Sequence, residues 1–334
     1  MSEAPLKAAI VGCGLIGKKR AAAMSGARLV ACADIDVSRA KALAGSVEGC
    51  VAFADWRDLL DRVACDFVIV ATLHDSLAGI AEAAVARGRH VLVEKPAGRF
   101  GGEIEPVLAA AERENVRVRV GLNHRYHRAL RKARELVDAG ALGDLMFVRG
   151  LYGHGGRPGY DREWRADPKR SGGGELIDQG PHLIDLARWF LGEFTLVRGF
   201  AGTFYWDMPV DDNGFLLLRT ADGKTAFLHA SCTEWKNTFS FEIFGKLGKL
   251  HLTGLGGSYG VERIAFYRML PEMGPPETTI YEYPMADDSW AVELAEFIDD
   301  IRLARRPEPG LRDALAVMRI IEQIYRESAD DHRS

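Results

Sequence analysis

The chain has 334 residues, of which 47% are hydrophobic and 27% are charged, and its formal net charge is -4. This length exceeds a typical domain of roughly 100–150 residues, so we expect two domains. The composition is typical of a globular protein and excludes a largely disordered chain. So small a net charge gives no reason to expect a nucleic-acid or membrane partner.

The five cysteines indicate a reducing compartment. Their number is odd and they form no CxxC pair, which argues against a disulfide framework. The first apolar run stops at Gly12, too early for a signal or membrane segment, and no other stretch approaches about 18 apolar residues. We therefore expect a soluble, cytoplasmic protein.

Residues 1–122 alternate short β-branched runs with alanine-rich segments of helical length. The expected strands are 6–11, 28–33, 66–71, 90–93 and 116–121. The expected helices lie near 15–24, 37–45, 76–88 and 102–114. Because each parallel crossover needs a helix, this alternation predicts a doubly wound α/β domain that binds a nucleotide.

The pattern changes after residue 122. A helix at 130–139 leads into a glycine-rich loop region over 150–174, followed by a helix at about 181–190. Extended segments at 214–220, 225–232 and 240–244, separated by turns, predict a mainly antiparallel sheet. Two amphipathic helices at about 288–304 and 310–327 close the chain. We expect residues 123–334 to form an α+β domain, whose last helices can pack back on the first domain and whose sheet can present one face to a partner subunit.

Gly12-Cys13-Gly14-Leu15-Ile16-Gly17 follows the first expected strand and opens the first helix. In this G-x-G-x-x-G pattern the first glycine permits a tight turn, the second lets the backbone approach a pyrophosphate, and the third lets the helix pack on the strand. The helix N-terminus supplies free N–H groups for the anion. Asp34 closes the next strand, where a carboxylate binds ribose hydroxyls and disfavours a 2′-phosphate. The sequence predicts NAD; NADP is not excluded, because Arg39 lies close by.

Glu94-Lys95-Pro96 ends the expected strand at 90–93, at the sheet edge where ligands bind in open α/β folds. A lysine there can donate a hydrogen bond to a substrate hydroxyl or carbonyl while hydride moves. The alternative is a surface Glu-Lys pair ahead of a loop.

The second polar cluster runs from Ser171 to Asp185 and contains three consecutive glycines. We interpret the glycines as allowing the backbone to approach a ligand. In a continuous helix Asp178 and His182 share a face, and the carboxylate can orient a histidine that accepts an alcohol proton. Pairing of His182 with Asp185 is a second possibility. A metal held by Asp178 and His182, or by the histidines at 124 and 127, competes with this interpretation, but no compact third ligand follows, so we predict no metal.

Together these motifs resemble the glucose–fructose oxidoreductase / inositol dehydrogenase / rhizopine catabolism (Gfo/Idh/MocA) family over essentially the whole chain. The Glu-Lys-Pro tripeptide and Gly-Gly-x-Leu-x-Asp-x-Gly-x-His are more specific than the dinucleotide pattern. The resemblance implies an N-terminal Rossmann domain (1–122), and a C-terminal domain (123–334) with a large open sheet used for homodimer or homotetramer assembly.

The resemblance also assigns roles to residues. Lys95 matches the lysine that contacts the reacting oxygen, and Asp178 and His182 match an aspartate–histidine pair with His182 as general acid/base. The expected cofactor-binding residues are Gly12, Gly14, Leu15, Ile16, Gly17, Asp34, Ile35, Arg39, Thr72, His74, Leu77, Glu94, Lys95, Asn123, Trp164 and Arg165. The expected substrate-binding residues are Lys95, Arg125, Tyr126, His154, Arg157, Tyr160, Asp178, His182 and Lys236.

Two segments depart from the family pattern. Thr72-Leu73-His74-Asp75-Ser76-Leu77 lacks the usual proline and final histidine, which changes the loop under the nicotinamide. Arg128 stands where a proline is common. Neither change removes a proposed catalytic group.

The family implies hydride transfer at a secondary alcohol of a sugar, sugar phosphate, nucleotide sugar or cyclitol. Arg157 and Lys236 could hold a phosphate or pyrophosphate, or they are solvated loop charges. A redox-neutral NAD-dependent glycosidase of the same family is one alternative. A non-enzymatic NAD-responsive regulator is the other, although it has no need of the three proposed catalytic residues.

Overall fold

The computed structural model describes residues 4–272 and 274–331. The chain divides into two compact units. Unit 1 comprises residues 1–123 and 290–316, and unit 2 comprises residues 124–289 and 317–334. The segment 290–316 therefore belongs with the N-terminal half of the chain.

Unit 1 is built from alternating strands and helices, as the sequence predicts. Its strands are β1 (Leu6–Val11), β2 (Ala27–Ala33), β3 (Val51–Phe53), β4 (Phe67–Val70), β5 (His90–Glu94) and β6 (Val118–Gly121). Its helices are α1 (Leu15–Ala22), α2 (Val37–Gly45), α3 (Trp56–Arg62), α4 (His74–Val85), α5 (Gly101–Arg113), nearly all of α10 (Ser289–Arg302) and the start of α11 (Leu311–Asp331).

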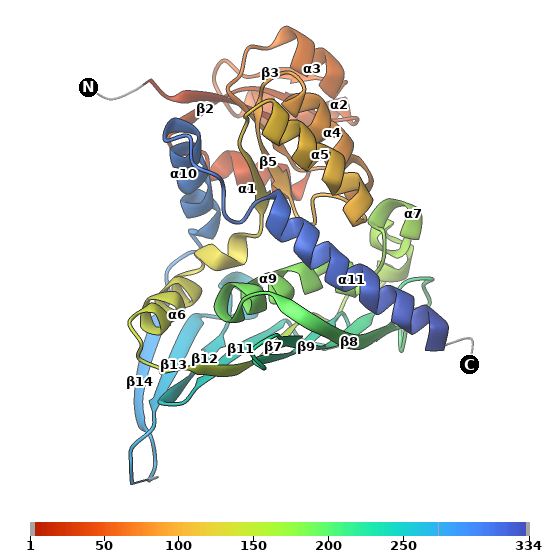
Figure 1. Ribbon diagram of the computed structural model, residues 1–334. Helices are drawn as coiled ribbons and strands as arrows, with labels where there is room; N and C mark the ends of the chain where they lie inside the picture. The colour runs from red at the N-terminus through yellow and green to blue at the C-terminus, as the bar shows by residue number, and fades with distance from the viewer. Residues whose placement is uncertain (1–3, 273, 332–334) are drawn as a thin grey trace. The chain divides into compact units, whose positions relative to one another are not determined.

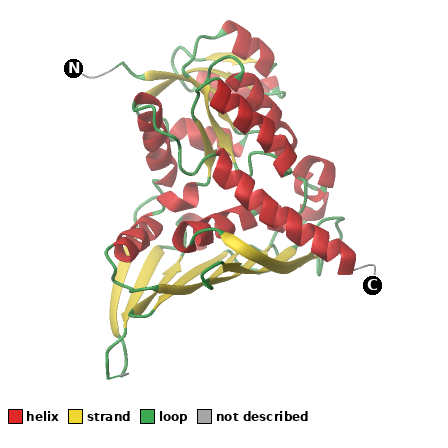
Figure 2. Ribbon diagram, in the orientation of Figure 1, coloured by secondary structure: helices red, strands yellow, loops and turns green. Residues whose placement is uncertain are grey.

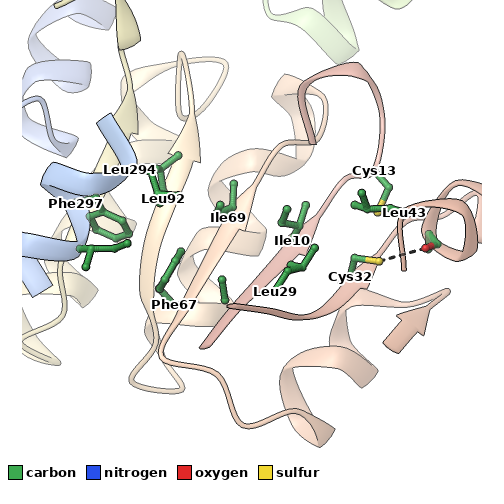
Figure 3. Close-up of a cluster of buried hydrophobic side chains, with 13 residues drawn as sticks. Ile10, Cys13, Leu29, Cys32, Leu43, Phe67, Ile69, Leu92, Leu294 and Phe297 are labelled. Atoms are coloured by element: carbon green, nitrogen blue, oxygen red, sulfur yellow. Dashed lines mark hydrogen bonds between the residues drawn. The ribbon is translucent and has the colours of Figure 1, made fainter. Parts of the chain in front are cut away.

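The strands of unit 1 form one parallel sheet in the order β3-β2-β1-β4-β5-β6. The order reverses between β1 and β4, which is where a doubly wound sheet binds its ligand. All four residues of β4 are buried because helices cover both faces. Figure 3 shows the core beneath this sheet, where Ile10, Ile69 and Leu92 come from neighbouring strands. The ring of Phe297 from α10 packs edge-on against Phe67 at 5.6 Å.

Unit 2 contains an eight-stranded sheet (Figure 1), in the order β14-β13-β12-β11-β7-β10-β9-β8. The strands are β7 (Leu145–Gly153), β8 (Phe194–Gly202), β9 (Asn213–Thr220), β10 (Thr225–Ser231), β11 (Thr238–Gly245), β12 (Gly248–Thr253), β13 (Glu262–Arg268) and β14 (Glu277–Tyr283). Its helical elements are most of η1 (Asn123–Tyr126), α6 (Arg128–Asp138), η2 (Tyr160–Arg162), η3 (Trp164–Ala166), α7 (Pro168–Ser171), α8 (Glu175–Asp178), α9 (Gly180–Leu191), η4 (Gly257–Tyr259) and the rest of α11. The β7–β10 pair is parallel and the other pairs are antiparallel, so the predicted, mainly antiparallel open sheet is confirmed.

Alternate side chains divide this sheet into two faces. In Figure 2, α6 and α9 lie on one face, and there Leu228 and Phe241 are fully buried. On the other face, Leu217 and Phe227 remain about half exposed. The period-2 alternation of β9, β10 and β11 is the pattern expected of a sheet with one buried face.

Several expected boundaries were wrong. The glycine-rich region 150–174 begins inside β7 and contains the short helices η2, η3 and α7. The expected helix across Asp178 and His182 is broken, because α8 ends at Asp178 and α9 begins at Gly180 with Pro181 in its first turn. No expected element corresponds to α3 or to the strands β3, β7, β8, β12, β13 and β14. Among the described residues, no helix is both long enough and apolar enough to span a membrane.

Candidate active site

The glycine-rich turn between β1 and α1 has the geometry that its sequence predicts. Gly12 has φ +96°, and a Cβ there would lie 2.4 Å from the carbonyl oxygen of Ala71 at the end of β4. A Cβ on Gly17 would lie 1.9 Å from the carbonyl oxygen of Gly12. A Cβ on Gly14 would meet nothing within 4 Å. Two glycines are therefore required by the fold, and the third leaves open space at the N-terminus of α1.

The open space at Gly14 is bordered by groups that suit an adenine dinucleotide. The Asp34 carboxylate accepts hydrogen bonds from the backbone N–H groups of Cys13 (2.7 Å) and Asp36 (2.8 Å), which fixes it beside the turn. Leu15 and Ile35, which directly follow Gly14 and Asp34 in the chain, are 73% and 98% exposed. The first turn of α1 carries no acidic residue, so its free N–H groups favour an anion. These residues fit a bound NAD, which would supply the hydride acceptor or donor at C4 of its nicotinamide.

Arg39 forms an exposed ion pair with Asp36, at 3.3 Å. The remaining loop residues expected around the cofactor differ in exposure. Thr72 is partly exposed, whereas His74 and Asn123 are buried. Leu77 on α4 is fully buried. Its side chain packs inside the protein and has no surface left for contact with a cofactor.

Lys95 stands directly after β5, at the carboxyl edge of the sheet, and its side chain is partly exposed. The Lys95–Pro96 peptide bond is cis. The residue before it, Glu94, does not face open space. Its carboxylate binds the guanidinium of Arg20 at 2.6 and 2.7 Å. Glu94 therefore anchors the segment that carries Lys95.

Arg20 is completely enclosed between two carboxylates. Besides Glu94 it binds Glu293 of α10, and its guanidinium lies 4.4 Å from the ring centre of Trp290. Burial raises the pKa of Glu293, and the charge of Arg20 opposes that rise. Gly121 of β6 is required here, since a Cβ would lie 2.7 Å from Arg20. No sequence signal pointed to Arg20.

In unit 2, the last two glycines of the triplet before α8 pack against the protein itself. A Cβ on Gly174 would lie 1.8 Å from the carbonyl oxygen of Asp211, and one on Gly173 would lie 2.3 Å from the Tyr325 hydroxyl. Our interpretation that these glycines admit a ligand was therefore wrong for Gly173 and Gly174. The buried Asp211 carboxylate accepts hydrogen bonds from the N–H groups of Gly174 and Leu176 and from Tyr325, at 2.7–2.8 Å. Burial raises the pKa of Asp211 to about 6, although these bonds act in the opposite direction.

Asp178 ends α8 and is buried. Its carboxylate accepts a hydrogen bond of 2.8 Å from Nε of Arg165, and Glu163 lies 3.7 Å from the same guanidinium. The negative charge of Asp178 raises the pKa of Arg165. Arg165 also stacks on Trp164, at 4.7 Å. Trp164 and Arg165, which we expected to contact the cofactor, thus lie together beside the carboxylate of Asp178, the proposed catalytic residue.

His182, in the first turn of α9, is buried and lies face to face with a second imidazole. The rings of His182 and His124 are 3.7 Å apart with an interplanar angle of 11°. Tyr152 and Phe239 meet the His124 ring edge-on, at 5.0 and 5.8 Å. His124 therefore fixes the plane of the proposed acid/base residue, a role that its sequence position did not reveal.

His154 and Tyr160 converge on the buried Glu175. The Tyr160 hydroxyl donates to one carboxylate oxygen at 3.2 Å, and His154 Nε2 lies 3.4 Å from the other. Burial alone would lower the pKa of His154. The hydrogen bond and the negative charge of Glu175 outweigh this effect, so the pKa of His154 is raised. Burial raises the pKa of Tyr160. Two residues expected to bind substrate thus share a polar cluster with the buried carboxylate.

Other expected substrate residues have different surroundings. Arg125 is buried and donates two hydrogen bonds to Asp185, at 2.8 and 2.5 Å. Both carboxylate oxygens of Asp185 therefore bind an arginine. Tyr126 is buried. Arg157 binds Glu163 at 2.7 Å, whereas Lys236 is exposed. Arg157 is thus engaged by a carboxylate, and binding of a phosphate by Arg157 and Lys236 stays a prediction.

Within residues 4–272 and 274–331, one group of side chains has the composition of a metal site: His127, Glu262 and Asp287, whose ligand atoms lie within 4.8 Å of one another. Each of these three side chains takes part in a hydrogen bond within the protein. His127 Nδ1 lies 2.9 Å from Glu262, whose second oxygen accepts from the N–H of Ala129. Asp287 accepts from the N–H of Ser289. The cluster is a hydrogen-bonded network that fastens the start of α6.

Two family models match this chain. The model described as "Oxidoreductase family, NAD-binding Rossmann fold" matches residues 6–122, and the "GFO/IDH/MocA C-terminal domain" model matches residues 130–251. Together they cover more than half of the sequence. The chain belongs to the Gfo/Idh/MocA oxidoreductase family. Unit 1 is therefore an NAD-binding Rossmann domain, which confirms the predicted fold and cofactor.

Similar proteins within the Gfo/Idh/MocA family include two curated dehydrogenases. Levoglucosan dehydrogenase of Pseudarthrobacter phenanthrenivorans is 32% identical over 172 residues, which are 51% of this chain and 44% of that enzyme. Inositol 2-dehydrogenase 2 of Saccharopolyspora erythraea is 29% identical over 73% of this chain and 72% of that enzyme. The solved structure of a levoglucosan dehydrogenase with NADH and levoglucosan has a TM-score of 0.86, with 24% identity over 98% of this chain and 97% of that one. It shows the shared fold.

Proposed function

We propose that this Gfo/Idh/MocA protein transfers hydride between NAD(H) and a secondary alcohol carbon of a sugar, nucleotide sugar, sugar phosphate or cyclitol. The observation that carries the proposal is the buried imidazole of His182, held against His124 near the start of α9. A sensor or a purely structural NAD protein has no need of an oriented acid/base group. The dehydrogenases among the chain's relatives, named for levoglucosan and inositol, support a cyclic polyol substrate.

Each proposed catalytic residue has a distinct task. His182 accepts the hydroxyl proton during oxidation and returns it during reduction. Lys95 donates a hydrogen bond to the reacting oxygen and stabilises the negative charge that develops there. Asp178, held by its bond to Arg165, orients His182 and stabilises its protonated form. When bound, NAD supplies or accepts the hydride.

We expect NAD to be preferred over NADP. The Asp34 carboxylate is fixed by two backbone N–H groups where a 2′-phosphate would meet its charge. Arg39, the cation that could favour that phosphate, is paired with Asp36. An Asp34→Ala variant should lower the preference for NAD. A wild-type preference for NADP would contradict this assignment.

The decisive experiment is a substrate screen. Sugars, inositols, sugar phosphates, nucleotide sugars and levoglucosan are incubated with NAD or NADH, and absorbance of the reduced cofactor is followed in both directions. We expect cofactor-dependent turnover with at least one cyclic polyol. Glycoside cleavage without net NADH formation would support a redox-neutral glycosidase instead, and binding of NAD without any turnover would support a regulator.

Variants test the assigned residues once a substrate is known. His182→Ala and Lys95→Met should each lower kcat by a factor on the order of 100 or more, while NADH still binds. Lys41→Met, at an exposed lysine of α2, is the control and should leave kcat unchanged. Undiminished turnover in either active-site variant would refute its role.

The outer face of the unit 2 sheet supports a second proposal, which is assembly into a homodimer or homotetramer. Leu196, Phe200, Leu217 and Phe227 are each 40–52% exposed on β8, β9 and β10. Contiguous apolar side chains on a sheet face are unusual for a monomer. Light scattering at micromolar concentration should give a multiple of 36.7 kDa, and Phe227→Arg should lower that mass. A monomeric wild type would refute the proposal.

A further inference from the structure

Two large aromatic side chains of unit 2 are exposed side by side. Tyr205 is 61% exposed and Trp235 is 63% exposed, and their rings meet edge-to-face at 4.6 Å with an angle of 81°. We call this pair the aromatic platform. It lies outside the residues assigned above to cofactor, acid/base chemistry or assembly.

A buried carboxylate holds the Tyr205 half of the platform in place. Asp212 is fully buried and accepts hydrogen bonds from three consecutive backbone N–H groups, those of residues 204–206, at 2.7–3.0 Å. The Trp206 indole then donates to the carbonyl of Cys232 at 3.0 Å. This loop is therefore ordered before any ligand arrives, which reduces the entropy lost on binding.

The Trp235 half shows a conformation that side chains seldom adopt. Trp235 has φ +54°, a left-handed value that costs a bulky residue free energy and is often found at functional positions. Gly155 allows this arrangement, since a Cβ there would lie 2.9 Å from Cα of Trp235. The preceding residue, Glu234, is fixed by its N–H, which donates to the carbonyl of His154 at 3.0 Å.

A continuous row of rings connects the platform to the proposed substrate cluster. Tyr205 contacts Trp206 at 5.2 Å, Trp206 contacts Tyr160 at 5.6 Å, and Tyr160 contacts His154 at 5.5 Å. Tyr160 and His154 are the two residues that converge on Glu175. The row thus runs from an exposed surface to a buried carboxylate within a single unit.

We infer that the aromatic platform is a subsite for a second sugar ring, so that the substrate is a glycoside or oligosaccharide whose far ring stacks on Trp235 and Tyr205. This inference rests on the proposed function. A pyranose has an apolar C–H face that covers an aromatic ring and hydroxyls around its edge. Exposed polar groups stand beside the platform: Lys236 is exposed, and the Asn237 amide is held by the Ser258 hydroxyl at 2.7 Å.

The size of the platform argues against a second copy of the chain as the occupant. A stable protein–protein interface buries about 800 Å² on each partner, with some 20–30 residues a side. Two exposed rings cover far less than that, whereas they match the dimensions of one or two pyranose rings. The fixed loops also suit a small rigid ligand more than a large adaptable surface.

Binding of disaccharides to the NADH complex tests this subsite. The probes are maltose, cellobiose and galactinol, with glucose and myo-inositol as their single-ring counterparts. The protein carries ¹⁵N-labelled tryptophan, and Trp235→Phe identifies the Trp235 signal among the six indoles. We expect at least one disaccharide to shift that signal, and Trp235→Ala to weaken its binding about fivefold while single-ring binding is unchanged.

Phe204→Ala is the matched control, because Phe204 is equally exposed at 65% but packs against Phe215 and makes no ring contact with Trp235 that the structure records. It should bind disaccharides as the wild type does. Any of three results would overturn the subsite. Either no disaccharide shifts the Trp235 signal, or the Trp235→Ala variant binds disaccharides as the wild type does. The third is that Trp235→Ala changes the native mass measured by light scattering. Disaccharide binding without any NAD-dependent turnover would leave the subsite standing and refute the proposed dehydrogenase.

Discussion

Replacing Arg20 by methionine tests how the Lys95 segment is held. Arg20 is buried between Glu94 and Glu293, and methionine keeps most of its length but none of its charge. Removal of one partner from a buried ion network costs about 3–5 kcal/mol, because uncompensated charges stay behind. Two carboxylates would be left without their partner here. We therefore expect the free energy of unfolding at pH 8 to fall by an amount near the upper end of that range.

The pH dependence of this loss gives a sharper signature. Burial raises the pKa of Glu293, and Arg20 opposes the rise, so the Arg20→Met variant should raise it further. A carboxyl whose folded pKa exceeds its unfolded value contributes most stability below the unfolded pKa, and loses it as pH rises through the folded pKa. The variant should therefore approach the wild type near pH 5 and fall furthest behind it at pH 8.

Urea denaturation of both proteins at pH 5 and pH 8 measures the effect. Arg87→Met is the matched control: its ion pair with Asp61 is exposed, so its loss should stay below about 1 kcal/mol at both pH values. With a substrate in hand, Arg20→Met should lower kcat more than it raises KM, since Glu94 directly precedes Lys95. A loss at pH 8 as small as that of the control, or a loss that grows toward pH 5, would refute the reasoning.

Three further predictions follow from single positions. Gly14→Ala should weaken NADH binding, measured by fluorescence titration, by about tenfold or more with little loss of stability, whereas Gly45→Ala, also at an open position, should leave binding unchanged. His124→Leu should lower kcat about tenfold or more at constant NADH affinity, and His124→Phe should restore much of it by keeping a ring against His182; equal losses in both would contradict the stacking role. His154→Gln should lower the Tm most below pH 6 and least at pH 9, because the raised pKa of His154 stabilises the fold only while the imidazole is protonated.

Unit 1 was largely predictable because its signals are local. The strands β1, β4 and β5 are nearly continuous apolar runs, and the glycine pattern and Asp34 occupy neighbouring strand ends. The one strand missed, β3, has three residues that are partly or largely exposed, so it shows neither an apolar run nor alternation. Even here the burial of Arg20 could not be foreseen, because Glu293 is 273 residues away in the chain.

Unit 2 was less predictable because its sheet depends on pairing between distant segments. β14 is exposed along most of its length. Without a buried face, its sequence has no alternation of apolar and polar residues that would indicate a strand. β7 continues into glycine-rich sequence that resembles a loop, although its residues 150 and 152 lie on the buried face. The motif predicts Asp178 and His182 as catalytic residues. Because α8 ends at Asp178 and α9 begins at Gly180, the two residues do not share one helix face. Their positions depend on Arg165, Asp211 and His124 instead.

The three glycines of the dinucleotide turn and the triplet before α8 look alike in sequence, and only the space around each distinguishes their roles. At Gly14 an added Cβ would meet nothing within 4 Å, whereas at Gly174 it would lie 1.8 Å from the Asp211 carbonyl oxygen. The first vacancy is available to a ligand, and the second is already filled by the protein. A methyl group at Gly14 should therefore harm binding and spare folding, and one at Gly174 should harm folding first. The same residue type thus leaves space for a cofactor in one unit and holds the turn before α8 together in the other.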